Sequence, residues 1–212
     1  MTKKYSEIND EYDTSKSSFL LETFALEIQM CDKIKDKKRM QRIYPKTEKL
    51  QAVINDPKVM GIIKECGGKM YMTEKKWEKA LNELFECFKY YQECGNLRAK
   101  EILLYVILAS MLSKSEINHV DTREAKVYKD DQTVIAITSL HQAYEKNDIK
   151  NIQKILQDKR HSFLRDPEFA QYLDDLLRSI RLNVLEQKVK PYRTIKLEFL
   201  AKELNVSLKE VR

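Results

Sequence analysis

Apolar residues recur at the spacing of an α-helix along most of this chain, and this pattern constrains the fold more than any other feature. Two stripes continue over several turns without a gap, and stripes of that width normally face other helices. The 212 residues include only 4 glycines and 4 prolines, which also favours packed helices, so the sequence predicts an all-α fold. The two stripes are Trp77, Ala80, Leu81, Leu84, Phe85, Phe88 and Tyr91, and Phe169, Tyr172, Leu173, Leu176, Leu177, Ile180 and Val184.

Residues that favour helix ends divide this pattern into segments. Asp56-Pro57 and Asp166-Pro167 each place an N-cap acid before a proline that suits the first helical position. Gly95 is typical of a left-handed helix end. Short connections between consecutive helices predict stacked helical hairpins. The expected helices are residues 17–32, 36–54, 57–73, 75–94, 97–113, 131–146, 148–159 and 167–189.

The last 22 residues change character. Lys190-Pro191 closes the preceding helix, and a short β-compatible piece is expected at 192–195. An apolar face at 197–204 and a capping box at 207–210 then predict a helix-turn-helix, the beginning of a winged helix. The sequence stops before that second helix completes two turns.

Composition bounds the possible partners and chemistry. The net charge of +6 is weak evidence for a polyanionic partner. Cys31, Cys66, Cys87 and Cys94 are widely spaced, so we expect free thiols, no metal site and no cofactor. The longest apolar run, at 102–112, is too short for a bilayer and predicts a buried helix. The three histidines, His119, His141 and His161, are isolated, and nothing in their spacing indicates an enzyme.

The stretch KECGGKMYM at 64–72 places two adjacent glycines, a cysteine and a lysine inside an expected helix. A phosphate loop would need a preceding strand and a Ser or Thr after the lysine, but Met70 stands there. A metal site would need further ligands near Cys66. We therefore predict that Gly67 and Gly68, with Gly61 before them, allow a neighbouring helix to approach closely.

A basic segment at 33–49 contains eight basic residues and two acidic ones. It is either a solvated outer helix face or a surface that docks an acidic protein or a phosphate-bearing ligand. Only Tyr44 could stack on a nucleic-acid base, and Pro45 should kink or split the helix here. The candidate partner-binding residues in this segment are Lys33, Lys35, Lys37, Lys38, Arg39 and Arg42.

Four segments of the chain carry a family resemblance: FALEIQM at 24–30, MGIIKECGGKM at 60–70, EAKVYKDD at 124–131, and LLRSIRLNVLEQKVKPYRTIKLEFLAKELNV at 176–206. They resemble PCI-domain subunits, which occur in the proteasome lid, translation initiation factor three and the COP-nine signalosome. The resemblance is closest to the family of signalosome subunit two, and the last segment is also similar to the family's proteasome-lid paralogue.

The resemblance implies a right-handed α-solenoid of TPR-like helical hairpins that leads into a PCI domain with a truncated winged helix. The expected parts are a polar tail at 1–16, repeats at 17–94, the helical part of the PCI domain at 95–190 and an incomplete winged helix at 191–212. The family has further repeats upstream and a complete winged helix, so the sequence is expected to be an internal fragment.

The resemblance also implies a non-catalytic scaffold of the cytoplasm and nucleus. Its helical repeats would dock a cullin-RING ubiquitin ligase, from which a separate subunit removes the modifier Nedd8. Its PCI region would join other signalosome subunits, with Tyr192 and Ile195 as candidate contacts. No cofactor, nucleic acid or membrane is expected. The alternatives are a PCI subunit of the proteasome regulatory particle lid and, from another class, a helix-turn-helix nucleic-acid-binding protein.

Overall fold

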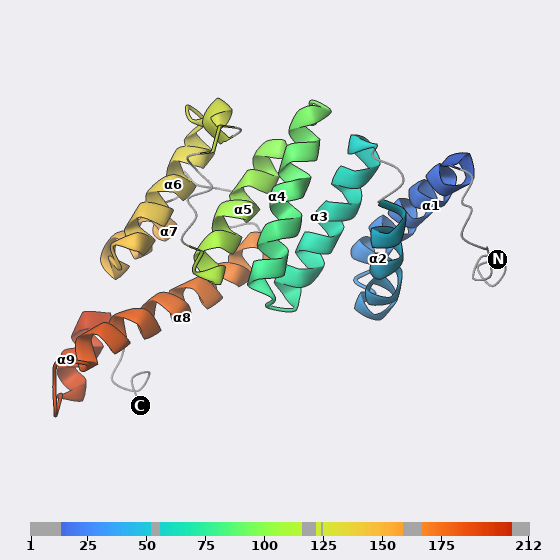
Figure 1. The fold of residues 1–212 in the computed structure, drawn as a ribbon. Coiled ribbons are helices and arrows are strands. Elements are labelled where there is room, and N and C mark those ends of the chain that lie inside the picture. The colour runs from blue at the N-terminus through green and yellow to red at the C-terminus, as the bar shows by residue number, and fades with distance from the viewer. Residues whose placement is uncertain (1–13, 52–55, 116–121, 124, 159–166, 205–212) are drawn as a thin grey trace. The chain divides into compact units, whose positions relative to one another are not determined.

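The computed structural model describes residues 14–51, 56–115, 122–123, 125–158 and 167–204. Every regular element in these ranges is a helix (Figure 1), which confirms the predicted all-α class. The chain divides into two compact units, Met1–Leu103 and Leu104–Arg212. The elements are α1 (Thr14–Lys33), α2 (Lys37–Gln51), α3 (Pro57–Thr73), α4 (Trp77–Glu93), α5 (Ala99–Ser113), the 3-10 helix η3 (Ala125–Tyr128), α6 (Gln132–Glu145), α7 (Ile149–Gln157), α8 (Pro167–Val189) and α9 (Leu197–Leu204).

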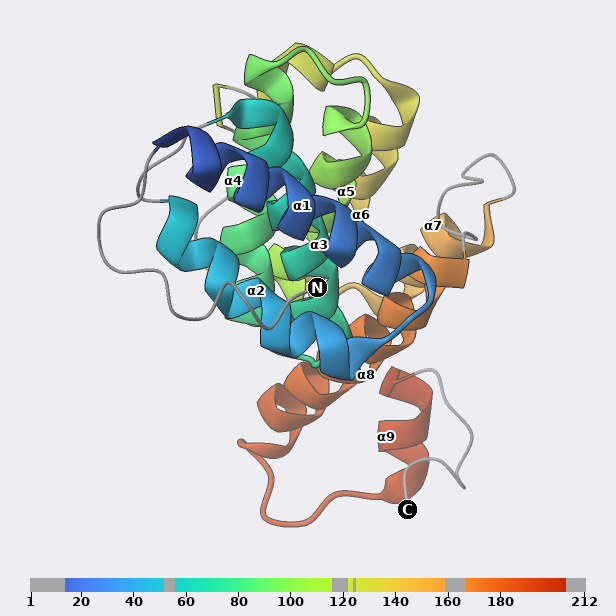
Figure 2. The same ribbon diagram turned by 90° about the vertical axis from the view of Figure 1, so that its right-hand side faces the viewer.

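The first unit is built from two helical hairpins. Helices α3 and α4 form its most extensive pair, and α1 packs against both α2 and α3. Figure 2 shows α1 and α2 side by side in front of α3. The stripe predicted on α4 is confirmed as a packing face, because Leu84, Phe88 and Tyr91 are almost fully buried.

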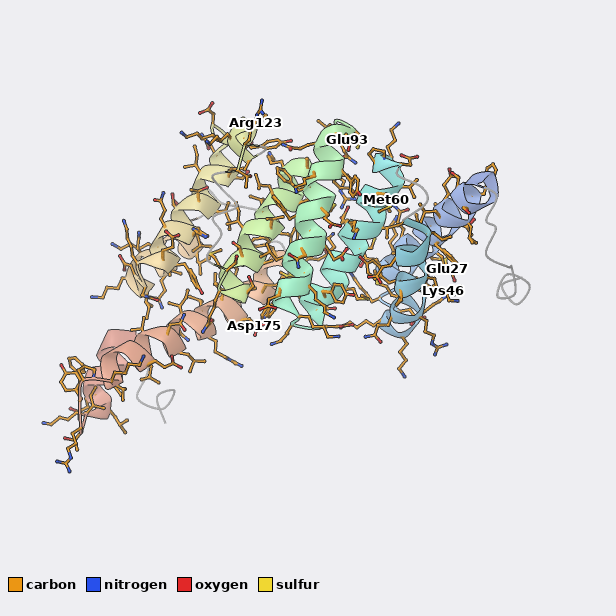
Figure 3. All side chains as sticks on the ribbon, in the orientation of Figure 1. Glu27, Lys46, Met60, Glu93, Arg123 and Asp175 are labelled. Carbon is orange, nitrogen blue, oxygen red and sulfur yellow. The ribbon has the colours of Figure 1, made fainter. Side chains whose placement is uncertain are left out.

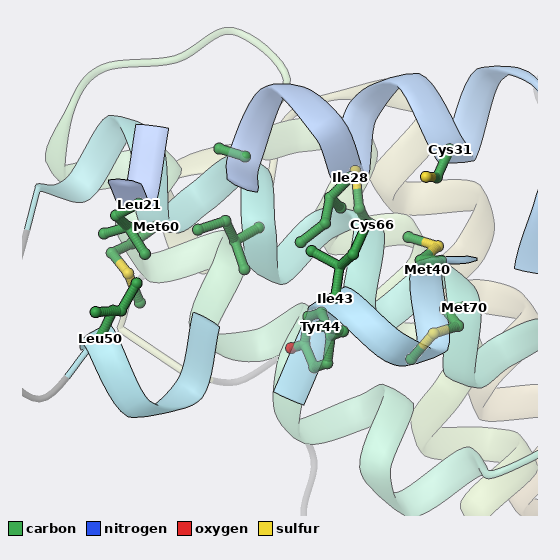
Figure 4. Packing of buried hydrophobic residues seen from close by; sticks show 12 residues of the cluster. Leu21, Ile28, Cys31, Met40, Ile43, Tyr44, Leu50, Met60, Cys66 and Met70 are labelled. Carbon is green, nitrogen blue, oxygen red and sulfur yellow. The ribbon is translucent and has the colours of Figure 1, made fainter. Parts of the chain in front are cut away.

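A second apolar cluster joins the first hairpin to α3 (Figure 4). Ile28 from α1, Tyr44 from α2 and Ile63 from α3 are each at most 1% exposed. Such a cluster fixes α1 and α2 on α3, since interiors of this kind are packed as densely as organic crystals. Its members are Leu21, Ala25, Ile28, Cys31, Met40, Ile43, Tyr44, Leu50, Met60, Ile63, Cys66 and Met70.

Helix α2 continues through Pro45, so the expected split is wrong. Proline removes one helical hydrogen bond and normally breaks a helix. Here the ring is exposed, whereas Tyr44 and Thr47 beside it are buried. The Thr47 hydroxyl also donates to the Tyr44 carbonyl at 2.6 Å. Burial on both sides of the proline therefore holds the helix together.

Several helices end in the same left-handed turn. Gly95 has φ +65°, as predicted, and Lys35, Lys75, Lys114 and Asn147 take the same conformation after their helices. In each turn the next residue donates its N–H to a carbonyl five positions back, as Lys76 does to Tyr71 at 3.0 Å. This arrangement is the Schellman motif. Only the glycine could be recognised from sequence, because lysine has no preference for this conformation.

The second unit contains the end of α5 and helices α6 to α9. Within it Leu176 and Ile180 of the second predicted stripe are fully buried, and the Tyr105 ring meets the Phe169 ring at 5.3 Å between centroids. His141 is buried on α6. No described helix is long and apolar enough to span a membrane.

Helix α8 ends at Val189, just before Lys190-Pro191, and α9 follows as predicted. The β-compatible piece at 192–195 is not a strand, because its backbone forms a bend with no partner strand among the described residues. An unpaired strand would leave its backbone groups without hydrogen bonds. His119, His161, Asp166 and the capping box at 207–210 lie outside the described residues.

We expect Lys75→Gly to raise the free energy of unfolding by about 0.5–1 kcal/mol, since glycine adopts the left-handed turn without the steric cost of a side chain. Urea unfolding followed by circular dichroism measures the change. Lys79→Gly, inside α4, is the matched control and should lower stability by about 1 kcal/mol. Equal losses in both variants would contradict the assignment of Lys75 to a strained turn.

Candidate functional site

Two adjacent charged residues of α3 are buried and paired within the first unit. Glu65 is 4% exposed and accepts a 2.6 Å hydrogen bond from the Tyr91 hydroxyl on α4. The Lys69 ammonium lies 3.1 Å from the same carboxylate, and the Arg98 guanidinium also donates to it. Glu65 therefore connects α3 with α4 and with the residue that precedes α5.

Lys64 forms the second half of this buried charged cluster. Its ammonium lies 3.0 Å from the Glu83 carboxylate and 2.7 Å from that of Glu86, both on α4. The Tyr44 hydroxyl, from α2, donates to Glu83. Burial acts to lower the pKa of Lys64, but its bonds to Glu86 and Glu83 outweigh this and the pKa is raised. Lys64 thus remains charged and links α3 to α4, which Tyr44 ties to α2.

The buried tyrosines of the cluster are held in their protonated form. Burial raises the pKa of both Tyr44 and Tyr91, and the carboxylates that accept their hydrogen bonds raise it further. A hydroxyl whose pKa is raised in this way keeps its proton near neutral pH. The cluster therefore has a structural role, which is to hold the helices together through hydrogen bonds and ion pairs.

The three helical glycines of α3 lie against large side chains, as predicted. A Cβ added to Gly67 would come within 2.2 Å of the Tyr44 ring, and one added to Gly68 within 2.6 Å of Leu84. At Gly61 it would come within 2.4 Å of the Tyr91 ring. These distances are far below a van der Waals contact, so α3 can approach α2 and α4 this closely only because the side chains are missing.

The four cysteines are free thiols, as expected. Burial raises the pKa of the Cys66 thiol to about 12, and Cys87 donates a hydrogen bond from its sulfur to the Gly61 carbonyl at 3.2 Å. No group of His, Cys, Asp and Glu side chains able to hold a metal ion occurs in the ranges that the structure describes.

The structure divides the predicted basic segment into paired and outward-facing residues. The Arg39 guanidinium donates to the Glu27 carboxylate of α1, and the distance from Nε to Oε1 is 2.9 Å. The Lys35 ammonium lies 3.7 Å from the Asp32 carboxylate. The Arg39 bond links α2 to α1, whereas the Lys35 pair is local to the turn between them. Lys33, Lys37, Lys38 and Arg42 are all exposed.

Tyr192 and Ile195 lie between α8 and α9 in the second unit. The Tyr192 side chain is 52% exposed, and its ring meets the Phe199 ring edge to face at 6.4 Å between centroids. Its backbone N–H donates to the Val189 carbonyl at 3.0 Å, while Ile195 is half-buried. An exposed aromatic pair of this kind suits a protein contact.

Sequence reasoning missed an exposed apolar row on the first hairpin. Phe19, Leu26 and Met30 on α1, and Ile34 just after it, are between 46% and 69% exposed. Their spacing of seven, four and four residues places them on one side of the helix, opposite the buried Leu21, Ala25 and Ile28. The segment FLLETFALEIQM, residues 19–30, has apolar residues on two opposite faces of the helix, and this pattern could have indicated the exposed row.

Comparison with known proteins gives consistent similarities. The PCI domain family matches residues 141–212. The chain is 47% identical to COP9 signalosome complex subunit 2 of Dictyostelium discoideum over 199 residues, which cover 94% of this chain and 44% of that protein. It is 45% identical to the subunit of that name in Schizosaccharomyces pombe over 202 residues, which cover 95% of this chain and 46% of that one.

A more distant similarity links the chain to the proteasome. It is 22% identical to the probable 26S proteasome regulatory subunit rpn-6.2 of Caenorhabditis briggsae over 157 residues, which cover 72% of this chain and 38% of that protein. The chain spans less than half the length of the signalosome relatives described above.

We expect Gly67→Ala to lower the free energy of unfolding by about 1–3 kcal/mol through overpacking against Tyr44. In an exposed helix the same change raises stability by about 1 kcal/mol, so the sign of the effect is diagnostic. Thermal or urea unfolding measures it. Asn82→Ala, at an exposed position of α4, is the control and should be neutral or slightly stabilising. A gain in stability from Gly67→Ala would show that α3 is not closely packed.

We expect Tyr91→Phe to cost about 1.5–3 kcal/mol, because it removes one hydrogen bond to the buried Glu65 carboxylate and keeps the ring that faces Gly61. Tyr90→Phe, the half-buried neighbour, should change stability by less than about 0.5 kcal/mol. Urea unfolding measures both effects. Equal effects in the two variants would show that the Tyr91 hydroxyl does not stabilise the buried Glu65 carboxylate.

Proposed function

Because this chain belongs to the PCI-domain family, and within it to the family of COP9 signalosome subunit 2, we propose that it is part of a non-catalytic scaffold subunit of a signalosome. The observation that carries this proposal is the identity of 47% over nearly the whole chain. The corresponding figure for the proteasome relative is 22%, which favours the signalosome over the proteasome lid. The cytoplasm and nucleus are the proposed compartments, from the same resemblance.

The internal structure of the first unit supports a scaffolding role. A scaffold must hold its binding surfaces at fixed positions, and here the buried charged cluster and the three helical glycines fix α2, α3 and α4 to one another. Lys64 and Glu65, the charged residues that are buried in the described part of this unit, are both used for that purpose. We propose that the first unit belongs to the helical repeats that dock a cullin-RING ubiquitin ligase, from which a sibling subunit removes Nedd8.

The exposed apolar row on α1 supports packing against a further helical element. Four large apolar side chains on one face of a surface helix are more than a solvated helix needs. In stacked helical repeats each hairpin buries such a face against its neighbour. We propose that a further repeat, in a protein as long as the signalosome relatives, covers Phe19, Leu26 and Met30.

The segment between α8 and α9 is proposed to join the other subunits. It lies within the residues that match the PCI domain, and it exposes Tyr192 together with Leu197 and Phe199. Exposed aromatic and apolar side chains near each other are typical of the central part of a protein interface. Tyr192 and Ile195 therefore remain our candidate contacts in the subunit ring.

Affinity purification of the full-length protein, followed by mass spectrometry, tests this function. We expect the other signalosome subunits and cullin-RING ligases to be recovered together. Tyr192→Asp in the full-length protein should reduce recovery of the sibling subunits, whereas Lys190→Asp, an exposed neighbour, should reduce it less. Recovery of proteasome subunits without signalosome subunits would refute the proposal.

A further inference from the structure

The outward face of α2 carries a row of basic side chains. Lys38, Arg42 and Lys46 are exposed and follow one another at intervals of four residues, the spacing that aligns side chains along one face of a helix. Met40, Ile43 and Tyr44, on the opposite face, are buried in the apolar cluster. Figure 3 marks Lys46 on α2 and Glu27 on α1. We call Lys38, Arg42 and Lys46 the basic row.

No described acidic side chain forms an ion pair with a member of the basic row. Glu27 is bound to Arg39, and Glu74 is bound to Lys76 and to Gln41. Burial raises the pKa of Tyr71, and the nearby charge of Glu48, the acidic residue within α2, raises that pKa further. Glu27 and Glu74 are therefore engaged with residues outside the basic row.

The row does not help the helix to form. Like charges four residues apart on a helix disfavour it, and α2 already contains Pro45. The helix is held instead by its buried face, so these three charges can be changed with little effect on the fold. A basic row that is exposed, without an ion pair to any acidic side chain in the described ranges, and unnecessary for folding is available to a partner.

We propose that the basic row of α2 binds an acidic helix of a partner protein. Steps of four residues along a helix correspond to about 6 Å, so acidic residues at the same interval on a second helix can each meet one basic side chain. The choice of a protein partner rests on the scaffold function proposed above. It also rests on Tyr44, the aromatic residue of this segment, which is 1% exposed and cannot stack on a nucleic-acid base.

Nuclear magnetic resonance titration of the isotopically labelled 212-residue chain tests this interaction at low ionic strength. The probe is an alanine-based helical peptide of about 20 residues with three glutamates four residues apart. We expect saturable shifts of the α2 amides that weaken as salt is added. The same peptide with glutamine in place of glutamate should not bind.

Two triple variants with the same loss of charge separate the basic row from general attraction. Lys38→Ala, Arg42→Ala and Lys46→Ala together should weaken peptide binding by about tenfold or more, as expected when several charge pairs are lost. Lys58→Ala, Lys79→Ala and Lys89→Ala together, at exposed positions of α3 and α4, should weaken it by less than about threefold.

Three outcomes would overturn the proposal. They are no binding of the glutamate peptide at millimolar concentration, equal weakening by the two triple variants, and tighter binding of a DNA duplex to the same row. If the peptide fails to bind but the full-length protein recovers signalosome subunits, the proposed role of the basic row is refuted and the proposed scaffold function is retained. If the peptide binds and proteasome subunits are recovered instead, the proposed signalosome membership is refuted and the proposed role of the basic row is retained.

Discussion

Helix α3 is enclosed by α1, α2 and α4, and the architecture of the first unit depends on how closely these neighbours approach it. Gly67 leaves room for the Tyr44 ring, and Gly68 leaves room for Leu84. The same close approach removes water from Lys64 and Glu65, which follow each other in the enclosed helix. Because an unpaired buried charge costs several kcal/mol, both residues need fixed partners on the surrounding helices. Close packing and charge pairing are therefore two consequences of one geometry.

The helices themselves could be predicted from the sequence because their signals are local. The stripe from Trp77 to Tyr91 and the Asp56-Pro57 helix start each follow from residues a few positions apart. The buried charged cluster could not be predicted, since Tyr44 and Glu83, or Glu65 and Arg98, meet across more than thirty residues. Pro45 inside an intact helix was not predicted either, because the burial of Tyr44 and Thr47 overrides the local preference of proline. The left-handed turn at Lys75 was not predicted because lysine, unlike glycine, gives no signal for it.

In the basic segment, too, the sequence could predict the surface but not the partner of each charged residue. The composition of the 33–49 segment was enough to predict a basic surface, and the exposure of Lys38 and Arg42 agrees with it. It could not show that Arg39, the residue between them, is bound to Glu27. Sequence spacing predicts which residues share a face, but the partner of each charge depends on the neighbouring helix.

Buried charged residues make the first unit rigid, and exposed charged residues on α2 provide a surface for partners. Charges placed between helices, such as Lys64 and Glu65, are neutralised by their neighbours and fix those helices to one another. Charges on the outer face of α2 contribute nothing to that fixation and repel each other along the helix. The repulsion is tolerated because Ile43 and Tyr44 anchor the opposite face of the helix in the core. A helix anchored in this way can present like charges at constant spacing, and a rigid row of that kind loses little conformational entropy when an acidic partner binds.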